Sequence, residues 1–444
     1  MSNRNPFVRA ATWLAPVEPR ETRVVAAAFC LFFCVMAGYF AVRPLRETVG
    51  TVLGRDQVAN LWVVNAFLSV LIIPAYGAVV ARFRRSVFLP AAYACVAAVL
   101  AAIGFTMEGG QFPPFAAKVF YVFISLLNLF LISMFWSFLL EIFDKRQTKR
   151  LFSVIAAGGS AGALAGPAIS DLTVASIGSS GLLYLGAGLF AAAIVCQRIL
   201  LQLPREWNVE AASARDDRPI GGNVFAGATL ILRSPYLIGI ALFIVGVSTV
   251  STFLYFEQLR LAQITYPDLT DRTRVFARLD WIVQALTFGS QILLTGRIAA
   301  RFGLTTLLTM VPAAMVVGFL ALAGNGTFLA LAVVYVIRRW GEYAFLRPAR
   351  EMLWSPLDKE RKYKAKTTVD VPVYRGADAV IAKLNSALAN AGLAASGVML
   401  LGAAVAAAWG AVGWWLGRRF ESGATVVPKA APIASQSVVG GPGT

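Results

Sequence analysis

Residues 77–83 read GAVVARF, and residues 296–302 repeat this pattern as GRIAARF about half a chain later. Residues 144–146, DKR, are echoed in the same way by residues 358–360, DKE. In both pairs an apolar run about as long as a bilayer is thick ends in cations. Repetition at this spacing predicts two parallel halves of membrane-spanning helices. Such halves suit a protein that binds a solute at their interface and rocks around it.

The composition is typical of a protein that crosses a membrane several times. Of the 444 residues, 58% are hydrophobic and 14% are charged, and the mean hydropathy is +0.68. Apolar runs of about 20 residues, rising about 1.5 Å each, match a hydrocarbon core of roughly 30 Å. The net charge of +17 would suit a nucleic-acid partner. Because most cations lie at helix ends on one side, as membrane topology requires, we expect no such partner.

Apolar periodicity predicts an all-α protein with twelve transmembrane helices in two six-helix halves. The expected spans are residues 24–42, 61–81, 87–105, 117–143, 152–176, 181–201, 234–256, 276–296, 304–322, 327–347, 367–388 and 396–417. The expected domains are a cytoplasmic N-terminus over 1–23, bundles over 24–202 and 231–420, a cytoplasmic linker over 203–230 and a disordered tail over 421–444. The connections 177–181, 323–326 and 389–395 carry no cation, which predicts that both termini are cytoplasmic.

Two connections on the opposite side break this rule. Residues 43–55 and 257–278 hold arginines that topology does not explain: Arg43, Arg46, Arg55, Arg260, Arg272, Arg274 and Arg278. Arg43 and Arg46 share a helix face, and Glu47 lies four residues from Arg43 and can pair with it. These side chains form either an anion-binding cluster at the outer mouth of a cavity or an interfacial group whose cations reach the lipid headgroups.

The span 327–347 carries charge near its middle. Arg338 and Arg339 lie there, and Glu342 follows one turn after Arg338. An ionisable group in hydrocarbon costs about 2.5–3.5 kcal/mol, so such groups usually face a protein or water interior. We expect at least one of the two arginines to face a cavity, and the alternative is a purely structural Arg–Glu pair.

Other polar or aromatic residues of the spans are candidates for the same cavity. They are Asn128, Trp136, Tyr255, Asp280, Asp370, Arg375, Asp378 and Lys383. A structural network in which Asp378 pairs with Arg375 or Lys383 is an equal alternative, and Asp280 could bond Arg278 instead. The amide could join helices, and the aromatic side chains could serve packing.

The expected midplane carries more arginine than acid, and we expect guanidinium groups there without an acidic partner. A water-filled cavity with this excess prefers anions, because guanidinium forks suit phosphate or carboxylate oxygens. Further cations at cytoplasmic helix ends serve an inner gate, topology or both: Arg82, Lys149, Arg150, Arg301, Arg350, Lys364 and Lys366.

Several chemistries are not supported by the sequence. Histidine is absent, and the four cysteines lie in apolar segments: Cys30, Cys34, Cys95 and Cys196. We expect these thiols to be small buried hydrophobes, not disulfide partners or metal ligands. Without a metal motif, a nucleophile constellation or paired aspartates, we expect neither a metal, a cofactor nor an enzyme. The small-residue run 156–162, AAGGSAG, predicts close helix packing or a bending point.

Residues 348–352 read PAREM, 356–358 read PLD, and 362–375 read KYKAKTTVDVPVYR. Upstream, FWSF at 135–138 is followed by KRLF at 149–152. Together with Tyr39, Arg43, Arg46 and Glu47, these blocks resemble the plastid and intracellular-bacterial ATP:ADP antiporter family. The resemblance implies a twelve-helix fold of the major facilitator type and a nucleotide-binding role for the basic residue at Arg46. The chain departs from the family pattern at four positions: Ile124, Glu342, Arg347 and Asp378.

We therefore expect a secondary transporter in a bacterial inner membrane that exchanges a nucleotide or another phosphorylated metabolite by alternating access. Its expected partners are this small anionic solute and membrane lipid, and we expect a monomer. The residues expected to contact the anionic groups are Arg43 or Arg46, Arg338 or Arg339, and Arg375.

Two alternatives remain open from the sequence. A proton-coupled major-facilitator transporter of another small solute would use Asp280, Glu342 or Asp378 as its titrating group. A sensor that keeps the fold but has lost turnover would bind a ligand without flux.

Overall fold

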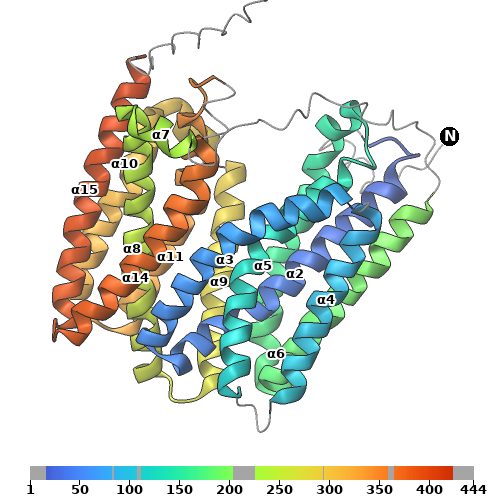
Figure 1. The fold of residues 1–444 in the computed structure, drawn as a ribbon, viewed down its shortest axis with the longest axis horizontal. Helices are drawn as coiled ribbons and strands as arrows, with labels where there is room; N and C mark the ends of the chain where they lie inside the picture. Colours follow the sequence, from blue (N-terminus) through green and yellow to red (C-terminus); the bar gives the residue numbers. More distant parts are fainter. Residues whose placement is uncertain are drawn as a thin grey trace, which may run out of the picture.

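A computed structural model describes residues 17–82, 85–107, 112–203, 226–293, 295–358 and 365–423. Within these residues the chain is all-α, and its helices form two bundles side by side (Figure 1). The expected linker and the expected C-terminal tail fall mostly outside the described residues. The fold class predicted from apolar periodicity is therefore confirmed.

In the described residues, the first bundle contains five helices. They are α2 (Thr22–Leu53), α3 (Arg55–Arg82), α4 (Arg85–Thr106), α5 (Pro114–Leu139) and α6 (Lys145–Gln202). The 58 residues of α6 hold two of the expected spans, which meet at Gly178 with a φ of 68°. A positive φ suits glycine, so the chain turns there and starts back across the membrane.

The second bundle begins with a short helix, and two of its expected spans, 327–347 and 367–388, contain a π-helical turn. Its elements are α7 (Ala226–Leu232), α8 (Pro235–Thr265), α9 (Leu269–Leu293), α10 (Thr295–Gly324), α11 (Phe328–Gly341), η1 (Glu342–Leu346), α12 (Arg347–Leu353), η2 (Val369–Val373), α14 (Tyr374–Asn390) and α15 (Ala395–Glu421). Gly303, with a φ of 77°, breaks α10. The elements η1 and η2 are π-helical turns, which are frequent at functional sites because they change the direction in which side chains point.

Seven of the described helices are long and apolar enough to cross a membrane. Among them α6 counts once although it holds two spans. The helices α3, α9, α11 and α14 are not among the seven. Charged residues lie inside α9 and α14, and the two arginines of α11 lie in its last turn.

Small residues of α6 allow close contact with α2. A Cβ atom added at Gly162 would lie 2.4 Å from the carbonyl oxygen of Phe33, and one at Gly166 would lie 2.7 Å from that of Ala37. The backbones can approach this closely only without side chains, as in other membrane helix pairs. The packing interpretation of the run 156–162 is therefore confirmed.

Two expected loops are wrong. Residues 43–53 continue α2 as helix, and α8 continues to Thr265 before α9 begins at Leu269. Hydropathy ends a span at its first cation, but the arginines here have partners in the protein interior, so the helices extend beyond the apolar run. Arg43 and Arg46 thus belong to a helix that lines the interface of the bundles.

The cysteines are free thiols, as expected, but they are not all buried. Cys30 and Cys95 are exposed, and Cys34 and Cys196 are half-buried. In a membrane protein an apolar segment can face lipid as well as the core, so apolar sequence does not predict burial.

Each bundle has its own apolar core. One core is built from α2 to α6, and it also includes Tyr255, Phe256 and Leu259 of α8. The other core is built from the second bundle. One end of α8 therefore packs into the first bundle.

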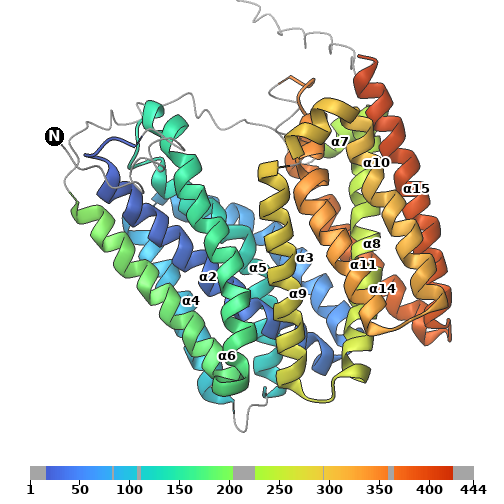
Figure 2. The same ribbon diagram turned by 180° about the vertical axis from the view of Figure 1, so that it is seen from behind.

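The two ends of the molecule differ. We call the end where α2 begins and α15 finishes the terminal end, and the opposite end the far end. The ribbons of the bundles diverge toward the terminal end (Figure 1). At the opposite end α6 and α9 lie side by side (Figure 2).

Candidate functional site

A cavity of about 650 Å³ lies between the bundles. This volume falls within the range of roughly 300–1,000 Å³ that is typical of small-molecule sites. Its wall comes from α2, α3 and α5 of the first bundle and from α8, α11, η1, α12, η2 and α14 of the second. Among the described residues, seven arginines line it: Arg43, Arg46, Arg338, Arg339, Arg347, Arg350 and Arg375.

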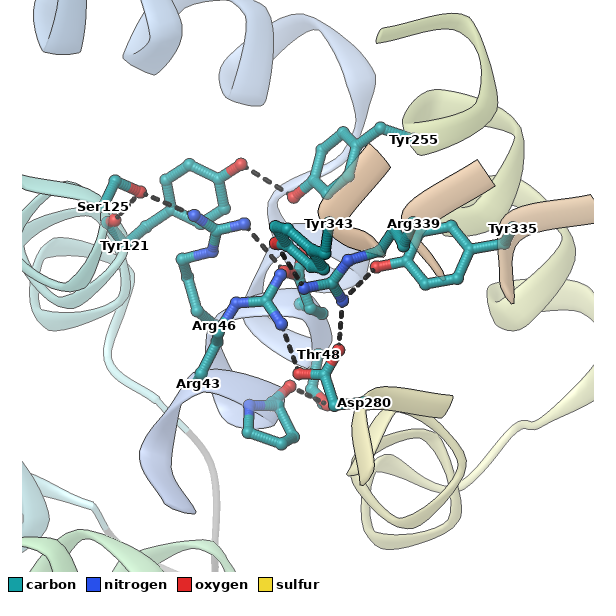
Figure 3. Close-up of polar contacts among 12 residues, drawn as sticks. Arg43, Arg46, Thr48, Tyr121, Ser125, Tyr255, Asp280, Tyr335, Arg339 and Tyr343 are labelled. Carbon is teal, nitrogen blue, oxygen red and sulfur yellow. Dashed lines mark hydrogen bonds and ion pairs between the residues drawn. The ribbon is translucent and has the colours of Figure 1, made fainter. Parts of the chain in front are cut away.

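Asp280 of α9 connects the two bundles beneath the cavity (Figure 3). Its carboxylate accepts hydrogen bonds from Arg43 of α2 and from Arg339 of α11. Asp280 is 3% exposed, so water does not screen these contacts strongly. One buried acid therefore holds a guanidinium from each half.

Arg46 lies one turn along α2 from Arg43 and belongs to the first wall. It donates to Glu47 at 2.7 Å and to Ser125 at 3.1 Å, and its guanidinium lies 5.4 Å from the centre of the Tyr121 ring. The Tyr121 hydroxyl is 2.7 Å from the Tyr255 hydroxyl of the second bundle (Figure 3). Glu47 also pairs with Arg43 at 3.6 Å, as the four-residue spacing predicts.

Arg338 and Arg339 of α11 diverge although they are adjacent in sequence. Arg338 donates to Ser251 at 2.6 Å and to Glu342 at 3.0 Å. Arg339 donates to the hydroxyls of Tyr335 and Tyr343, each at 3.0 Å. The predicted Arg–Glu pair is present, and both arginines also line the cavity, so the two alternatives are not exclusive.

The remaining arginines of the wall follow on the next turns of the chain. Arg347 lies 3.6 Å from Glu342, and its guanidinium is 4.4 Å from the centre of the Tyr343 ring. Arg350 lies 3.7 Å from Asp370 of η2.

On α14, Asp378 contacts both a cation and a hydroxyl. Arg375 lies 3.6 Å from Asp378, and Ser248 donates to the same carboxylate at 2.6 Å. Of the two partners considered for Asp378, the structure selects Arg375. Lys383 lies five residues along the helix, one beyond the four-residue spacing that places side chains side by side, and it donates to Asn60 of α3 instead.

The structure brings most of the predicted binding residues together. Those that line the cavity are Arg43, Arg46, Asn128, Tyr255, Arg338, Arg339, Glu342, Asp370, Arg375 and Asp378. Asp280 lies beneath the lining and bonds two of the lining arginines, not Arg278 as the alternative had it. Arg278 contacts Asp171 instead.

Trp136 and Lys383 are not part of the cavity wall. Trp136 packs among Phe32, Phe135 and Phe152 inside the first bundle. Lys383 is exposed near the far end. From the sequence alone, a tryptophan near a polar helix face could stack on a ligand or pack in the core. In the structure Trp136 packs in the core.

The expectation of arginines without an acidic partner is wrong. Every lining arginine has a carboxylate oxygen within 4 Å. The acids are shared, however, because Glu47, Asp280 and Glu342 each contact two arginines. The excess of cations over acids at the cavity is therefore retained.

The predicted gate residues have diverse positions. Arg350 lines the cavity, and Arg82 and Arg301 are exposed. Arg150 pairs with Glu21 at 2.5 Å and with Glu18 at 3.2 Å, and Lys366 pairs with Glu351 at 2.5 Å. The side chain of Lys149 and the whole of Lys364 lie outside the described part of the chain.

Sequence reasoning missed several lining residues that carry no charge or were not assigned a role. They are Trp62, Asn65, Ser125, Ser133, Ser251, Tyr335 and Arg347. Trp62 and Asn65 are three residues apart on α3, so their helix face could have been noticed. Nothing in the local sequence distinguishes the serines from those that join helices elsewhere.

The halves are joined directly at the far end. Asp171 of α6 contacts Arg274 at 3.3 Å, Arg278 at 3.2 Å and Trp281 at 3.3 Å. The hydroxyls of Thr48 and Thr273 lie 2.8 Å apart.

Two further contacts close the far end, one between α14 and α3 and one between α9 and α2. Ser386 donates to Asp56, and Arg272 donates to Thr51 at 3.0 Å.

In the described part of the chain, no group of three or more His, Cys, Asp or Glu side chains is placed to hold a metal ion.

The sequence and this arrangement match a known family model. The model of the major facilitator superfamily matches residues 26–346. The chain belongs to the major facilitator superfamily. Paired bundles around a central cavity and the predicted twelve spans agree with this membership. The chain is thus a multi-pass membrane protein with the fold of a transporter.

Curated relatives cover most of the chain. ADP,ATP carrier protein 1 of Chlamydia trachomatis is 24% identical over 438 residues, covering 83% of each chain. The protein of the same name from Chlamydia muridarum is also 24% identical, covering 83% of this chain and 82% of its own. The family resemblance noticed at residues 348–375 therefore extends along the chain.

Solved structures share the fold. The nucleoside transporter NupG has a TM-score of 0.56 at 14% identity, with 90% of this chain and 99% of that chain covered. A bacterial homolog of the human lysosomal transporter Spinster, inward-facing and unoccupied, has a TM-score of 0.58 at 12% identity, with coverages of 91% and 98%.

Proposed function

We propose that this protein is a secondary transporter that exchanges a nucleotide or a related phosphorylated metabolite across a bacterial inner membrane by alternating access. The observation that carries the proposal is the cavity of about 650 Å³, whose wall holds seven arginines contributed by both bundles. Guanidinium groups bind phosphate oxygens in pairs of parallel hydrogen bonds, which makes such a wall suited to phosphorylated solutes.

Aromatic rings beside the arginines support a cargo with a flat ring. Tyr39, Trp62, Tyr255 and Tyr374 line the same cavity. Base–aromatic stacking contributes about 1–3 kcal/mol per base and needs no particular base edge. Trp62 and Tyr374 are partly exposed, whereas Tyr39 and Tyr255 are buried. A wall of guanidinium groups and aromatic rings matches the two chemical parts of a nucleotide.

The relatives agree with this cargo. Two Chlamydia proteins named ADP,ATP carriers match 83% of this chain, and a nucleoside transporter shares its fold. We propose that the cations of the terminal end face the cytoplasm, as the distribution of Lys and Arg predicts. The structure would then be closed at the outer side and open toward the cytoplasm.

Reconstitution in liposomes tests the proposal. Labelled adenine, guanine and uracil nucleotides are offered to vesicles with and without unlabelled nucleotide inside. We expect uptake that depends on the internal nucleotide and is unchanged when the proton gradient is dissipated. Vesicles that take up no nucleotide under either condition would refute the nucleotide assignment, and uptake that collapses with the gradient would refute exchange in favour of proton coupling.

A further inference from the structure

We infer that the cavity selects a dianionic phosphate monoester, such as a nucleoside monophosphate, over di- and triphosphates; this inference rests on the proposed transport function. The argument uses the charge of the cavity and its distribution. The seven lining arginines face five carboxylates, four of them in the wall and Asp280 just beneath it. With these carboxylates ionised, the described residues of the site carry an excess of two positive charges.

The ion pairs divide these charges into separate networks. Glu47 joins Arg46 to Arg43, and Asp280 joins Arg43 to Arg339, so this network holds three cations and two anions. It spans both bundles and has one positive charge in excess.

A second network lies within the second bundle. Glu342 contacts Arg338 at 3.0 Å and Arg347 at 3.6 Å, which again leaves one positive charge in excess. The other two pairs, Arg350 with Asp370 and Arg375 with Asp378, are neutral. The excess is therefore confined to two networks.

Tyr343 lies between these two networks. Its hydroxyl accepts a hydrogen bond from Arg339 at 3.0 Å, and its ring faces the guanidinium of Arg347 at 4.4 Å. Tyr343 itself lines the cavity. Figure 3 shows its ring beside the guanidinium of Arg339. One group that accepts from both networks would sit against this tyrosine.

Of the two arginines that contact Tyr343, Arg347 is accessible and Arg339 is not. Its side chain is 55% exposed and lines the cavity, whereas the Arg339 side chain is 4% exposed and already bonds three oxygens. Arg347 can therefore turn toward a ligand without leaving a buried acid alone, because Glu342 keeps Arg338.

The charge of the cargo follows from this excess. A phosphate monoester carries about −1.5 to −2 at neutral pH, and each further phosphoryl group adds about one negative charge. A monoester therefore neutralises the two networks, whereas longer chains bring more negative charge than the excess of the described lining residues can neutralise inside a low-dielectric cavity. Like-charge contacts with the carboxylates of the wall then oppose binding.

Equilibrium binding to the purified full-length protein tests the inference. Isothermal titration is run with adenosine, adenosine monophosphate, diphosphate and triphosphate, and with ribose 5-phosphate. We expect the monophosphate to bind at least about tenfold more tightly than the triphosphate, and adenosine to bind more weakly than the monophosphate. Diphosphate or triphosphate binding that is equal or tighter would overturn the inference and leave the proposed nucleotide transport intact.

The other panel outcomes separate the two ideas. If ribose 5-phosphate binds and no nucleotide does, the dianion selection is supported and the nucleotide assignment fails. If no phosphorylated ligand binds, both fail.

Charge variants provide a second readout. Glu342→Gln adds one positive charge to the second network, so we expect the preference to move toward the diphosphate by about tenfold. Arg347→Gln removes the accessible cation, so monophosphate affinity should fall by at least about tenfold. Arg418→Gln removes an exposed arginine outside the cavity and should leave the ratio unchanged. If every variant folds and Glu342→Gln leaves the preference for monophosphate over diphosphate unchanged, the charge argument is contradicted.

Discussion

The far end of the bundle interface and the cavity are built from different kinds of contact. At the far end, hydroxyls and half-exposed ion pairs join the halves, such as Thr48 with Thr273 and Asp171 with Arg274 and Arg278. At the cavity, buried guanidinium groups share buried acids, with Asp280 held by both bundles.

The energetic consequences of the two designs differ. Single hydrogen bonds and half-exposed pairs contribute about 0–1.5 kcal/mol each, so the far end can open when its contacts break together. A buried charge that loses its partner costs about 3–5 kcal/mol, so the cavity network rearranges only when another charged group replaces the lost one. The comparison indicates that the far end sets the conformation and the cavity couples it to an anionic ligand.

The strongest test of this comparison prevents the far end from opening. Asp56→Cys and Ser386→Cys, introduced into a variant without the four native cysteines, should cross-link readily because the native side chains are hydrogen-bonded. Exchange in liposomes should then stop, since alternating access needs the far end to separate. Reductant should restore it, and each single-cysteine protein should remain active. Full exchange in the cross-linked protein would contradict a role for this end as a gate.

The next largest effect is expected inside the cavity. Arg339→Gln removes one of the two arginines that share Asp280, the other being Arg43. The truncation of one partner of a buried ion pair costs about 3 kcal/mol. Nucleotide exchange should fall by about 100-fold. The control Arg418→Gln, which removes an exposed arginine on α15, should keep at least half of the exchange rate. Equal rates for the two variants would remove Arg339 from the site.

A smaller effect is expected from loosening the far end without locking it. Asp171→Asn weakens its contacts with Arg274 and Arg278, whose side chains are about half exposed, so solvent screening limits the loss to about 1 kcal/mol. The population open at this end should rise about fivefold, measured by the rate at which a maleimide labels Thr273→Cys. Asp271→Asn, which removes an exposed acid on α9, the helix of Arg274 and Arg278, is the control. Identical labelling rates in the Asp171→Asn and Asp271→Asn proteins would show that the contacts of Asp171 do not hold the far end closed.

The smallest effect separates a core aromatic residue from a cavity aromatic residue. Trp136→Phe changes a side chain packed within the first bundle, so exchange should change by less than about twofold while thermal stability falls by about 1 kcal/mol. Tyr255→Phe, which removes the hydroxyl bonded to Tyr121, should lower nucleotide affinity with little loss of stability. A selective loss of affinity in Trp136→Phe would return this residue to the site.

The fold was predictable from the sequence because the signal was strong and one-dimensional. Twelve apolar runs of bilayer length, polar connections and a half-chain repeat specify an all-α membrane protein of two halves. The helix ends were less predictable. The extension of α2 through Arg43 and Arg46 depends on acidic partners. One of them, Asp280, lies more than 200 residues away in the sequence.

The site was predictable in part, for a related reason. A charge inside an apolar span is costly, so Arg338, Arg339 and Glu342 indicated the cavity without any structure. The pair of Arg338 with Glu342 follows from their four-residue spacing. The partner of Arg339 was not predictable, because Asp280 could bond Arg278 on its own helix or arginines on other helices. Serines of the wall, such as Ser125, have no signal that distinguishes them from serines that join helices.

A structure of the protein bound to a nucleoside monophosphate tests the central claim most directly. The account predicts the phosphate in the cavity between the bundles, with oxygens within hydrogen-bond distance of Arg339 or Arg347, and the base against the aromatic residues of the wall. A phosphate bound outside this cavity, or against a wall without any arginine contact, would contradict it.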